Sequence, residues 1–525
     1  MPARRVGCRT NHPGVHDGRM LAAVRSAAVM GIEAYAVTVE VDAAHGLPQW
    51  TIVGLPASAV KESRERVGAA LGNSGFTIPP RRVTVNLAPA DVRKEGTAFD
   101  LPIALGILIA TGQLEGASVA DVVAVGELGL DGCVRSVRGV LPIARLVGRE
   151  AGRTLLLPLE NVAEASLVSG ARLCAPEKLI DSIRWLRAGE RPTPSGGRAR
   201  ALRDDDPADF TDVAGQVAAK RALEIAAAGA HNVLLVGPPG AGKTMLARRL
   251  PGILPALSEA EALEVTAVHS VAGALSSGRP LASCRPFRAP HHSISDAGLI
   301  GGGSPPRPGE VSLAHHGVLF LDELLEFRRH VLEALRQPLE DGRVVIARVA
   351  ATVSFPARFT LVGATNPCPC GHAGELERRC ACSSSEIARY RNRLSGPMAD
   401  RIDMHVRVGA VPLDALSSAD AGERSSAVRE RVEGARARQE SRYATLSDRR
   451  TNAHAPMSCI ERGAHGVVTR QARAILVEAA GRLGLSARAY HRVLRVARTI
   501  ADLDGERDVG TPHVAEALGY RPVEP

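Results

Sequence analysis

A short glycine-rich segment constrains the fold of this chain more than any other part of its sequence. It lies between an apolar run at 233–236 and a helical pattern at 245–250, and it has the sequence Gly237-Pro238-Pro239-Gly240-Ala241-Gly242-Lys243-Thr244. Glycines let the backbone curl so that its N–H groups point at phosphate oxygens, and a helix that starts there adds its positive end. We therefore predict a P-loop that binds a nucleoside triphosphate, with Lys243 on the β- and γ-phosphates and Thr244 on Mg²⁺.

Polar residues follow two further apolar runs downstream of the P-loop. Asp322 and Glu323 follow the run at 318–321, and Asn366 comes after the run at 359–364. Because ligands bind at the carboxyl ends of strands in a parallel sheet, these side chains should face the P-loop. We expect Asp322 to bind Mg²⁺, Glu323 to polarise the attacking water and Asn366 to contact the γ-phosphate or that water. The pattern predicts hydrolysis as well as binding.

Composition sets broad limits on the partners of the chain. Its 525 residues predict two to four domains, and its net charge of +9 favours a polyanion, although 56 acidic residues mean that the basic excess must be local. No apolar run approaches eighteen residues, and the N-terminus lacks the apolar core of a signal peptide. We therefore expect a cytoplasmic protein without membrane contact, whose nine cysteines are thiols or metal ligands.

Changes in composition divide the chain into regions. The first region is a disordered extension, or a mis-assigned start with Met20 as the alternative initiator. Short strands and helices follow: a helix-like segment at 21–25, a half-buried strand at 35–41, a helix at 61–71 and a buried helix at 99–110. A linker rich in Pro, Gly and Asp comes after them. The nucleotide domain comes next, and a charged helix at 425–442 and a small helical bundle complete the chain. The predicted boundaries are 1–19, 20–187, 188–208, 209–407 and 408–525.

Four of the nine cysteines lie in one loop after Asn366, and they are Cys368, Cys370, Cys380 and Cys382. Two C-x-C pairs can close a tetrahedral thiolate site around Zn²⁺, which we favour. The alternative is that reduced thiols pack the loop. The histidine pairs at 291–292 and 315–316 lack a third ligand at helical spacing, so we expect loop or nucleic-acid contacts there.

Several longer strings, spread over the chain from Met20, resemble the YifB/ComM family of magnesium-chelatase-like AAA+ ATPases. They include Thr51-Ile52-Val53-Gly54-Leu55-Pro56, Phe287-Arg288-Ala289-Pro290-His291-His292, Asp400-Arg401-Ile402-Asp403 and Ser486-Ala487-Arg488-Ala489-Tyr490-His491. The resemblance implies an α/β fold with a P-loop AAA+ core, a C-terminal helical lid, ATP and Mg²⁺, and a homo-hexameric ring.

The same resemblance assigns roles to two arginines. Arg401 resembles the arginine finger that reaches the γ-phosphate of a neighbouring subunit, and Arg488 resembles the sensor-2 arginine of the lid. Arg492 and Arg495 share a helix face with Arg488 by spacing, and we expect that face to be solvated.

The N-terminal region resembles the α+β proteolytic domain of Lon-type proteases, which use a Ser-Lys dyad. The two dyad positions are occupied by Ala98 and Leu141. Neither side chain can attack a carbonyl or deprotonate a nucleophile. We therefore expect a non-catalytic scaffold or DNA-binding module.

Two classes of function remain open. The resemblance implies a DNA motor, a helicase that promotes branch migration in recombination or natural transformation and that acts on branched or single-stranded DNA. The alternative is a magnesium-chelatase-like or protein-remodelling ATPase subunit. The segment at 339–348 predicts a hairpin, and in the related MCM helicases a hairpin here places a basic residue in the pore. Arg348, with Arg343, would then hold DNA phosphates; otherwise both are ordinary strand-edge arginines.

Overall fold

The computed structural model describes residues 21–188, 208–275, 280–304, 306–348, 351–374, 378–410, 422–446, 451–462 and 466–521. The predicted N-terminal extension and residues 189–207 of the predicted linker lie outside this part of the chain. The first of two compact units comprises Met1–Ala201, His269–Leu281 and Arg348–Ala351, and the second comprises Leu202–Val268, Ala282–Ala347 and Thr352–Pro525. No helix in the described ranges is both long enough and apolar enough to cross a membrane.

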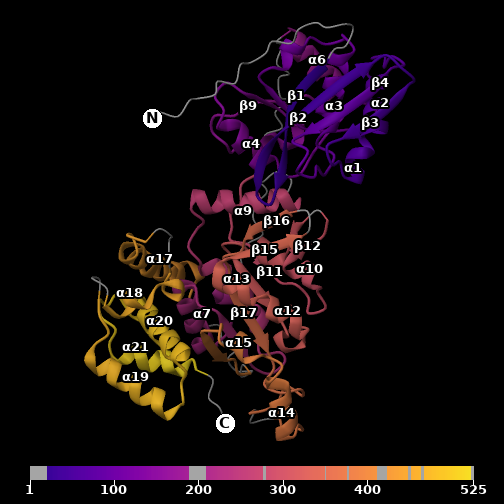
Figure 1. The fold of residues 1–525 in the computed structure, drawn as a ribbon. Helices are drawn as coiled ribbons and strands as arrows, with labels where there is room; N and C mark the ends of the chain where they lie inside the picture. Colours follow the sequence, from indigo (N-terminus) through magenta and orange to yellow (C-terminus); the bar gives the residue numbers. More distant parts are fainter. Residues whose placement is uncertain are drawn as a thin grey trace, which may run out of the picture. The chain divides into compact units, whose positions relative to one another are not determined.

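The first unit is built on a mixed sheet with the strand order β3-β4-β2-β1-β5-β8-β9 (Figure 1). β2 pairs antiparallel with β1 and β4, and the other neighbours in the sheet pair parallel. Val37, Val39 and Val41 of β2 are buried and alternate with more accessible residues, which confirms the predicted half-buried strand. The strands are β1 (Leu21–Met30), β2 (Glu33–Ala44), β3 (Gln49–Val53), β4 (Arg82–Ala88), β5 (Val122–Ala124), β8 (Thr154–Leu156) and β9 (Arg172–Cys174).

The helices of the first unit confirm one prediction and correct two. The helix predicted at 99–110 is α3 (Asp100–Ala110), and every one of its residues is buried. The segment at 21–25 is strand rather than helix, because its alternate burial matches a pleated strand and it pairs with β2 along its length. The helix predicted at 61–71 is divided at Glu62. The other helices are α1 (Ser58–Lys61), α2 (Ser63–Asn73), α4 (Val140–Gly148), α5 (Val162–Ala165) and α6 (Leu179–Ala188).

The second unit contains a parallel sheet with the strand order β11-β14-β17-β10-β18. All residues of β14 and β17 are buried, which explains why they form continuous apolar runs in the sequence. The order places β17 between β10 and β14, so the three predicted polar motifs end neighbouring strands. The strands are β10 (Val233–Val236), β11 (Phe287–Arg288), β14 (Val318–Leu321), β17 (Thr360–Thr365) and β18 (Met404–Arg407).

Helices of the C-terminal region share a core with this sheet. Leu235 of β10, Val406 of β18 and Val493 of α20 belong to one buried apolar cluster. The predicted charged helix is α17, with the predicted bounds. The main helices of the unit are α7 (Val217–Gly229), α8 (Lys243–Ile253), α9 (Glu259–Ala272), α12 (Arg329–Ala334), α14 (Ser384–Arg391), α17 (Ser425–Arg442), α18 (Met457–Arg462), α19 (Arg470–Arg482), α20 (Ala487–Leu503) and α21 (Thr511–Gly519).

The hairpin predicted at 339–348 begins later than expected. Residues 339–341 belong to α13 (Arg336–Asp341), which ends at Gly342 in the left-handed conformation. The hairpin itself consists of β15 (Arg343–Arg348) and β16 (Ala351–Pro356). Arg343 is exposed at its base, whereas the side chain of Arg348 lies outside the described part of the structure.

Candidate functional site

The glycine-rich segment joins β10 to α8 as predicted, and α8 begins at Lys243. Gly242 caps the helix with a φ of +86°, a conformation that favours glycine. Gly237 lies so close to the backbone just after β18 that an added Cβ would sit 2.1 Å from the Val408 carbonyl oxygen. The loop therefore requires glycine at both positions, and it directs the N-terminus of α8 at the space above the sheet.

Lys243 and Asn366 meet at the carboxyl ends of neighbouring strands. The buried Lys243 Nζ donates hydrogen bonds to the carbonyl oxygens of Gly237 and Pro238, at 2.7 and 2.8 Å, and to Asn366 Oδ1 at 3.2 Å. Burial lowers the pKa of Lys243, while the charges of Asp322 and Glu323 act in the opposite direction. The ammonium group is thus placed where a phosphate oxygen could replace the loop carbonyls.

Thr244 and Asp322 supply adjacent oxygen atoms of the kind that Mg²⁺ prefers. The Thr244 hydroxyl donates to Asp322 Oδ2 at 2.7 Å, and the Glu323 backbone N–H donates to Asp322 Oδ1 at 3.0 Å. This pair fits a Mg²⁺ site that is completed by phosphate and water oxygens. The surrounding cavity of about 470 Å³ has a volume typical of ligand sites. It is lined by Pro239, Gly240, Ala241, Gly242, Lys243, Thr244, Met245, Asp322, Glu323, Thr365 and Asn366.

His292 contacts this site, although spacing along the sequence did not identify it. Its Nδ1 lies 3.3 Å from Oε2 of Glu323, whose own backbone is left-handed with a φ of 51°. The His292 ring also packs against His291, with ring centroids 4.1 Å apart. The only signal in the sequence was the string that ends at His292, which follows β11, the neighbour of β14.

Arg401 and Arg488 do not line the cavity formed by their own chain. Arg401 donates to the carbonyl oxygens of Pro397, at 2.6 Å, and Arg336, at 3.2 Å, and it pairs with Glu340. The side chain of Arg488 is 71% exposed and lies 3.9 Å from Asp400 Oδ2. Both positions leave the predicted roles to be tested in the assembled protein.

The helix face predicted to be solvated is instead buried. The side chain of Arg492 is 7% exposed and donates to the Ile402 carbonyl oxygen and to Asp400 Oδ1, both at 2.9 Å. Arg495 is partly buried and donates to the Ala455 carbonyl oxygen at 3.1 Å. Their partners lie between 40 and 92 residues away in the sequence, so spacing along α20 gave no sign of them.

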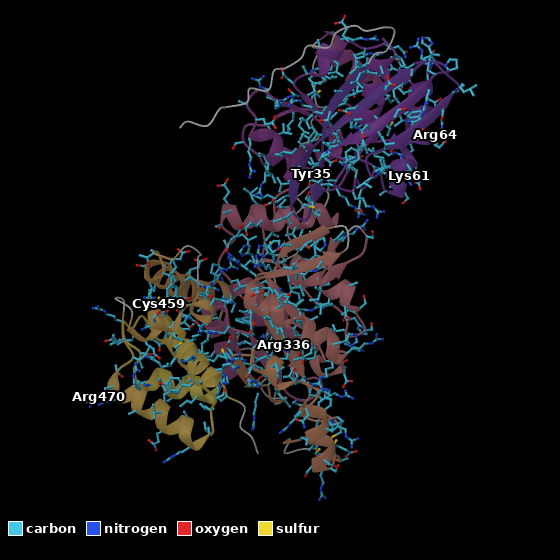
Figure 2. All side chains as sticks on the ribbon, in the orientation of Figure 1. Tyr35, Lys61, Arg64, Arg336, Cys459 and Arg470 are labelled. Carbon is cyan, nitrogen blue, oxygen red and sulfur yellow. The ribbon has the colours of Figure 1, made fainter. Side chains whose placement is uncertain are left out.

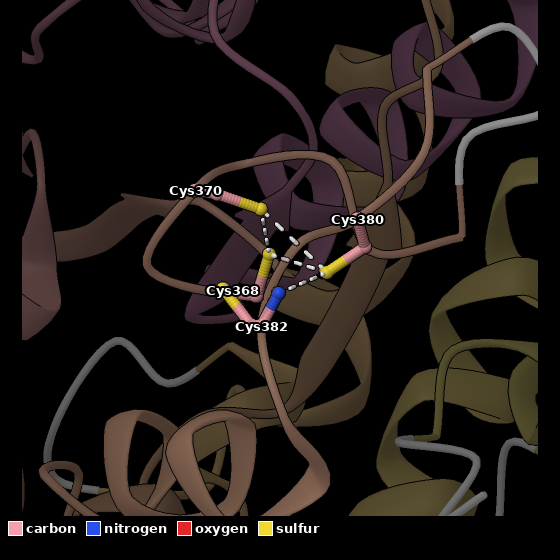
Figure 3. A group of neighbouring side chains, drawn as sticks. All are labelled: Cys368, Cys370, Cys380 and Cys382. Carbon is pink, nitrogen blue, oxygen red and sulfur yellow. Dashed lines mark hydrogen bonds between the residues drawn. The ribbon is translucent and has the colours of Figure 1, made fainter.

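The four clustered cysteines converge as predicted (Figure 3). The sulfur atoms of Cys368, Cys370 and Cys380 lie 3.4 to 3.7 Å apart, and that of Cys382 is within 4.8 Å of all three. Tetrahedral Zn²⁺ with Zn–S bonds of about 2.3 Å requires sulfur atoms about 3.8 Å apart. Backbone N–H groups of His372 and then Ala381, followed by the Cys368 thiol, lower the pKa of Cys370 to about 6. The donor set fits zinc.

A second polar cluster joins His315 and His316 to an acidic residue that is far from helical spacing in the sequence. Glu264 on α9 lies 3.0 Å from His315 Nε2 and 2.9 Å from His316 Nε2. His315 Nδ1 accepts a hydrogen bond from the Arg358 backbone N–H, so the ring proton is on Nε2 and points at Glu264. A protonated Nε2 cannot bind a metal ion, and we interpret the cluster as a structural one.

Comparison with known proteins agrees with this geometry. The family model "Magnesium chelatase, subunit ChlI" matches residues 209–416, which include the whole candidate site. "Subunit ChlI of Mg-chelatase" matches residues 39–161, and "Magnesium chelatase, subunit ChlI C-terminal" matches residues 422–521.

The chain is also similar to individual bacterial proteins, over most of its length or over part of it. Competence protein ComM of Haemophilus influenzae is 47% identical over 507 residues, which cover 95% of this chain and 97% of that protein. The uncharacterized protein YifB of Escherichia coli is 43% identical over 508 residues, with 96% and 97% covered. The magnesium-chelatase 38 kDa subunit of Rhodobacter capsulatus is 26% identical over 195 residues, with 34% and 54% covered. The chain therefore belongs to the YifB/ComM family of magnesium-chelatase-like AAA+ ATPases.

Proposed function

We propose that this protein is an ATP-hydrolysing ring motor that acts on DNA, as a helicase or branch-migration factor in recombination or natural transformation. The observation that supports the DNA assignment is the similarity to a competence protein, which is 47% identical over 95% of this chain. Similarity to the magnesium-chelatase 38 kDa subunit covers only 34% of the chain. The proposed parts are an N-terminal domain at 20–187, an AAA+ core at 209–407 and a helical lid at 408–525.

The side chains in the cavity have different roles in the proposed hydrolysis. Lys243 donates to the β- and γ-phosphate oxygens of ATP in place of the Gly237 and Pro238 carbonyls. Thr244 and Asp322 would hold Mg²⁺, which would neutralise charge on the phosphates. Glu323 polarises the attacking water, and Asn366 orients that water or the γ-phosphate from the end of β17.

The test of the DNA assignment is ATP turnover with and without branched DNA. We expect four-way-junction or forked DNA to raise the ATPase rate several-fold, and the protein to move or unwind the branch. An ATPase rate and a junction that are both unchanged, with intact protein, would favour a chelatase or protein-remodelling role.

Two arginines of the hairpin are proposed DNA contacts. Arg348→Ala and Arg343→Ala should each weaken junction binding and leave basal hydrolysis intact. Losing one phosphate contact should reduce the slope of log affinity against log salt by about one unit. If both variants bind junction DNA like wild type across a salt titration, the DNA contacts lie elsewhere in the protein.

Ring assembly is proposed because Arg401 lies outside the cavity of its own chain. Arg401→Ala should keep ATP affinity and lose hydrolysis, since its guanidinium stabilises charge at a neighbour's γ-phosphate. Mixing Arg401→Ala with Lys243→Ala subunits should restore part of the activity, because some interfaces then pair an intact finger with an intact P-loop. No recovery in demonstrably mixed rings would place Arg401 in a structural role.

A structural zinc is proposed at the four thiolates. Freshly purified, reduced protein should contain about one zinc per chain by metal analysis. Protein that is active but free of zinc would leave the cysteines as packing residues.

The N-terminal domain is proposed to be a non-catalytic scaffold or DNA-binding module. Ala98 and Leu141 occupy the positions of the Lon-type dyad, and both are aliphatic. We expect no peptide hydrolysis by the purified protein with ATP and an unfolded protein substrate such as casein.

A further inference from the structure

The cysteine cluster lies directly beside the nucleotide cavity. Only Pro367 separates Cys368 from Asn366, whose Oδ1 accepts the hydrogen bond from Lys243. Cys368 is fully buried, and its carbonyl and sulfur accept hydrogen bonds from the backbone N–H groups of Gly371 and Ala373, at 3.0 and 3.3 Å. A tight turn at 368–373 therefore begins where the catalytic strand ends.

This turn also contacts the P-loop. Gly371 is buried with a φ of +86°, and a Cβ added to it would lie 2.6 Å from Cδ of Pro239. Pro239 is part of the cavity lining. The backbone of the turn is thus in contact with the loop that binds phosphate.

The segment after Cys382 returns to the same site. Tyr390, buried on α14, hydrogen-bonds the side chain of Thr365, the residue before Asn366. Arg393 donates to the Leu325 carbonyl oxygen at 3.2 Å and to Glu326 at 2.8 Å, just after Glu323. Residues 368–374 and 378–393 therefore contact the P-loop, the end of β17 and the residues that follow β14.

We infer that metal bound by Cys368, Cys370, Cys380 and Cys382 holds this segment as a brace, which keeps Asn366 and Pro239 in the positions that ATP hydrolysis needs. The inference rests on the proposed ATPase function and gives the metal a role in turnover as well as in folding. Without the metal, the turn is joined to the residues before α14 by weak contacts of the thiols, including the bond from the Ala381 N–H to Cys370. Asn366 and Pro239 can then shift, and displacements of about 1 Å at a catalytic group cost up to about 100-fold in rate.

A glycine in the turn and one directly after it provide a matched pair of variants that leave the cysteines intact. Gly371→Ala and Gly374→Ala impose the same left-handed strain, with φ values of +86° and +82°, but only the first would meet Pro239. We expect both proteins to retain about one zinc per chain. Gly371→Ala should lower kcat for ATP by about tenfold or more, whereas Gly374→Ala should stay within about twofold of wild type.

Removing the metal should have the same effect as breaking the brace. Cys380→Ser should lose zinc and lower kcat by about 10- to 100-fold, whereas Cys459→Ser, on α18 (Figure 2), should change neither. Chelation of wild-type protein, followed by Mg²⁺, should reproduce the loss, and added Zn²⁺ should reverse it. Hydrogen exchange of amides 366–373 should accelerate in each protein without zinc.

The outcomes separate this inference from the proposed function. The brace would be overturned if wild-type protein holds zinc and hydrolyses ATP, and if Gly371→Ala and Cys380→Ser both have the wild-type kcat. Zinc-loaded wild-type protein that hydrolyses no ATP under any condition would overturn the proposed function instead. The exchange of amides 366–373, with and without zinc, would then still decide whether the metal orders the turn.

Discussion

Buried charged groups find their partners in different ways in the two units of this protein. In the first unit, the fully buried Asp100 accepts hydrogen bonds from the Ser63 hydroxyl at 2.5 Å, from Arg66 Nε at 2.6 Å and from the Leu128 N–H at 3.2 Å. These bonds tie α3 to α2 and to β6 (Glu127–Leu128). All three of these donors bond Asp100 inside the fold, so we interpret the cluster as structural.

In the second unit, the buried charge opens onto a cavity. Lys243 shares its protons among loop carbonyls and Asn366, and Thr244 and Asp322 bond each other at the same opening. These are bonds that a phosphate or a hydrated cation can replace. The comparison teaches that burial and charge do not by themselves identify a site; the cavity and the replaceable partners do.

The largest expected effect is on stability, and it belongs to the first unit. Asp100→Ala removes the buried carboxylate that bonds Arg66 and Ser63, which costs about 3 to 5 kcal/mol in the free energy of unfolding. The measurement is chemical denaturation of the full chain, with hydrogen exchange to localise the change. The kcat per folded, assembled protein should remain near wild type. A loss of kcat without a loss of stability would show that this cluster is functional, which would contradict the difference described between the two units.

The next effect is on ligand binding in the second unit. Lys243→Ala should weaken ATP binding by at least about 100-fold, or about 3 kcal/mol, and abolish turnover without lowering the melting temperature. Lys61→Ala is the matched control, because Lys61 is exposed on α1 of the first unit (Figure 2). Isothermal titration with ATP would show the difference, and equal affinities in the two variants would contradict the assignment.

Acid should affect the two units in opposite directions. Burial lowers the pKa of His315 and His405 in the second unit to about 4, so stability is lost as pH falls from about 6.5 toward 4. Burial raises the pKa of Glu164 in the first unit to about 7, so its contribution improves as pH falls from 7 to 4.5.

At pH 5, each histidine should cost the second unit about 1 to 2 kcal/mol relative to pH 7. Hydrogen exchange, corrected for its intrinsic pH dependence, should therefore show weaker protection in peptides of the second unit and no weakening around Glu164. A uniform change in both units would show that these buried groups do not control acid stability. His315→Gln should reduce the pH dependence of the second unit alone.

The smallest effect concerns His292, which contacts the predicted catalytic carboxylate. His292→Ala should lower kcat about three- to tenfold, or about 1 kcal/mol, with the KM for ATP unchanged, because Glu323 loses a group that orients it. His330→Ala is the control, since His330 is exposed and lies 3.5 Å from Asp296 instead. Equal kcat values in the two variants would remove His292 from the site.

The sequence predicted those parts of the site that depend on local order along the chain. Strand, loop and helix are contiguous around Lys243, and Asp322 and Asn366 directly follow strands, so the carboxyl-end rule for parallel sheets brought them together. The convergence of the four cysteines was also predicted, because both pairs lie in one loop.

Contacts between distant segments could not be predicted in this way. The partner of His315 lies 51 residues upstream on α9, and that of Arg492 lies 92 residues upstream. The strand at 21–25 was misjudged for a related reason. A short run of small apolar residues fits both the helical and the strand periodicity, and its pairing with β2 makes it a strand.

Rapid-quench analysis of ATP bound to Glu323→Gln shows whether this carboxylate drives hydrolysis. We expect the variant to bind ATP as tightly as wild type and to hold it unhydrolysed, with turnover lowered about 10²- to 10⁴-fold, because water is no longer polarised. Hydrolysis of bound ATP at the wild-type rate would contradict the claim that β14 supplies the catalytic carboxylate.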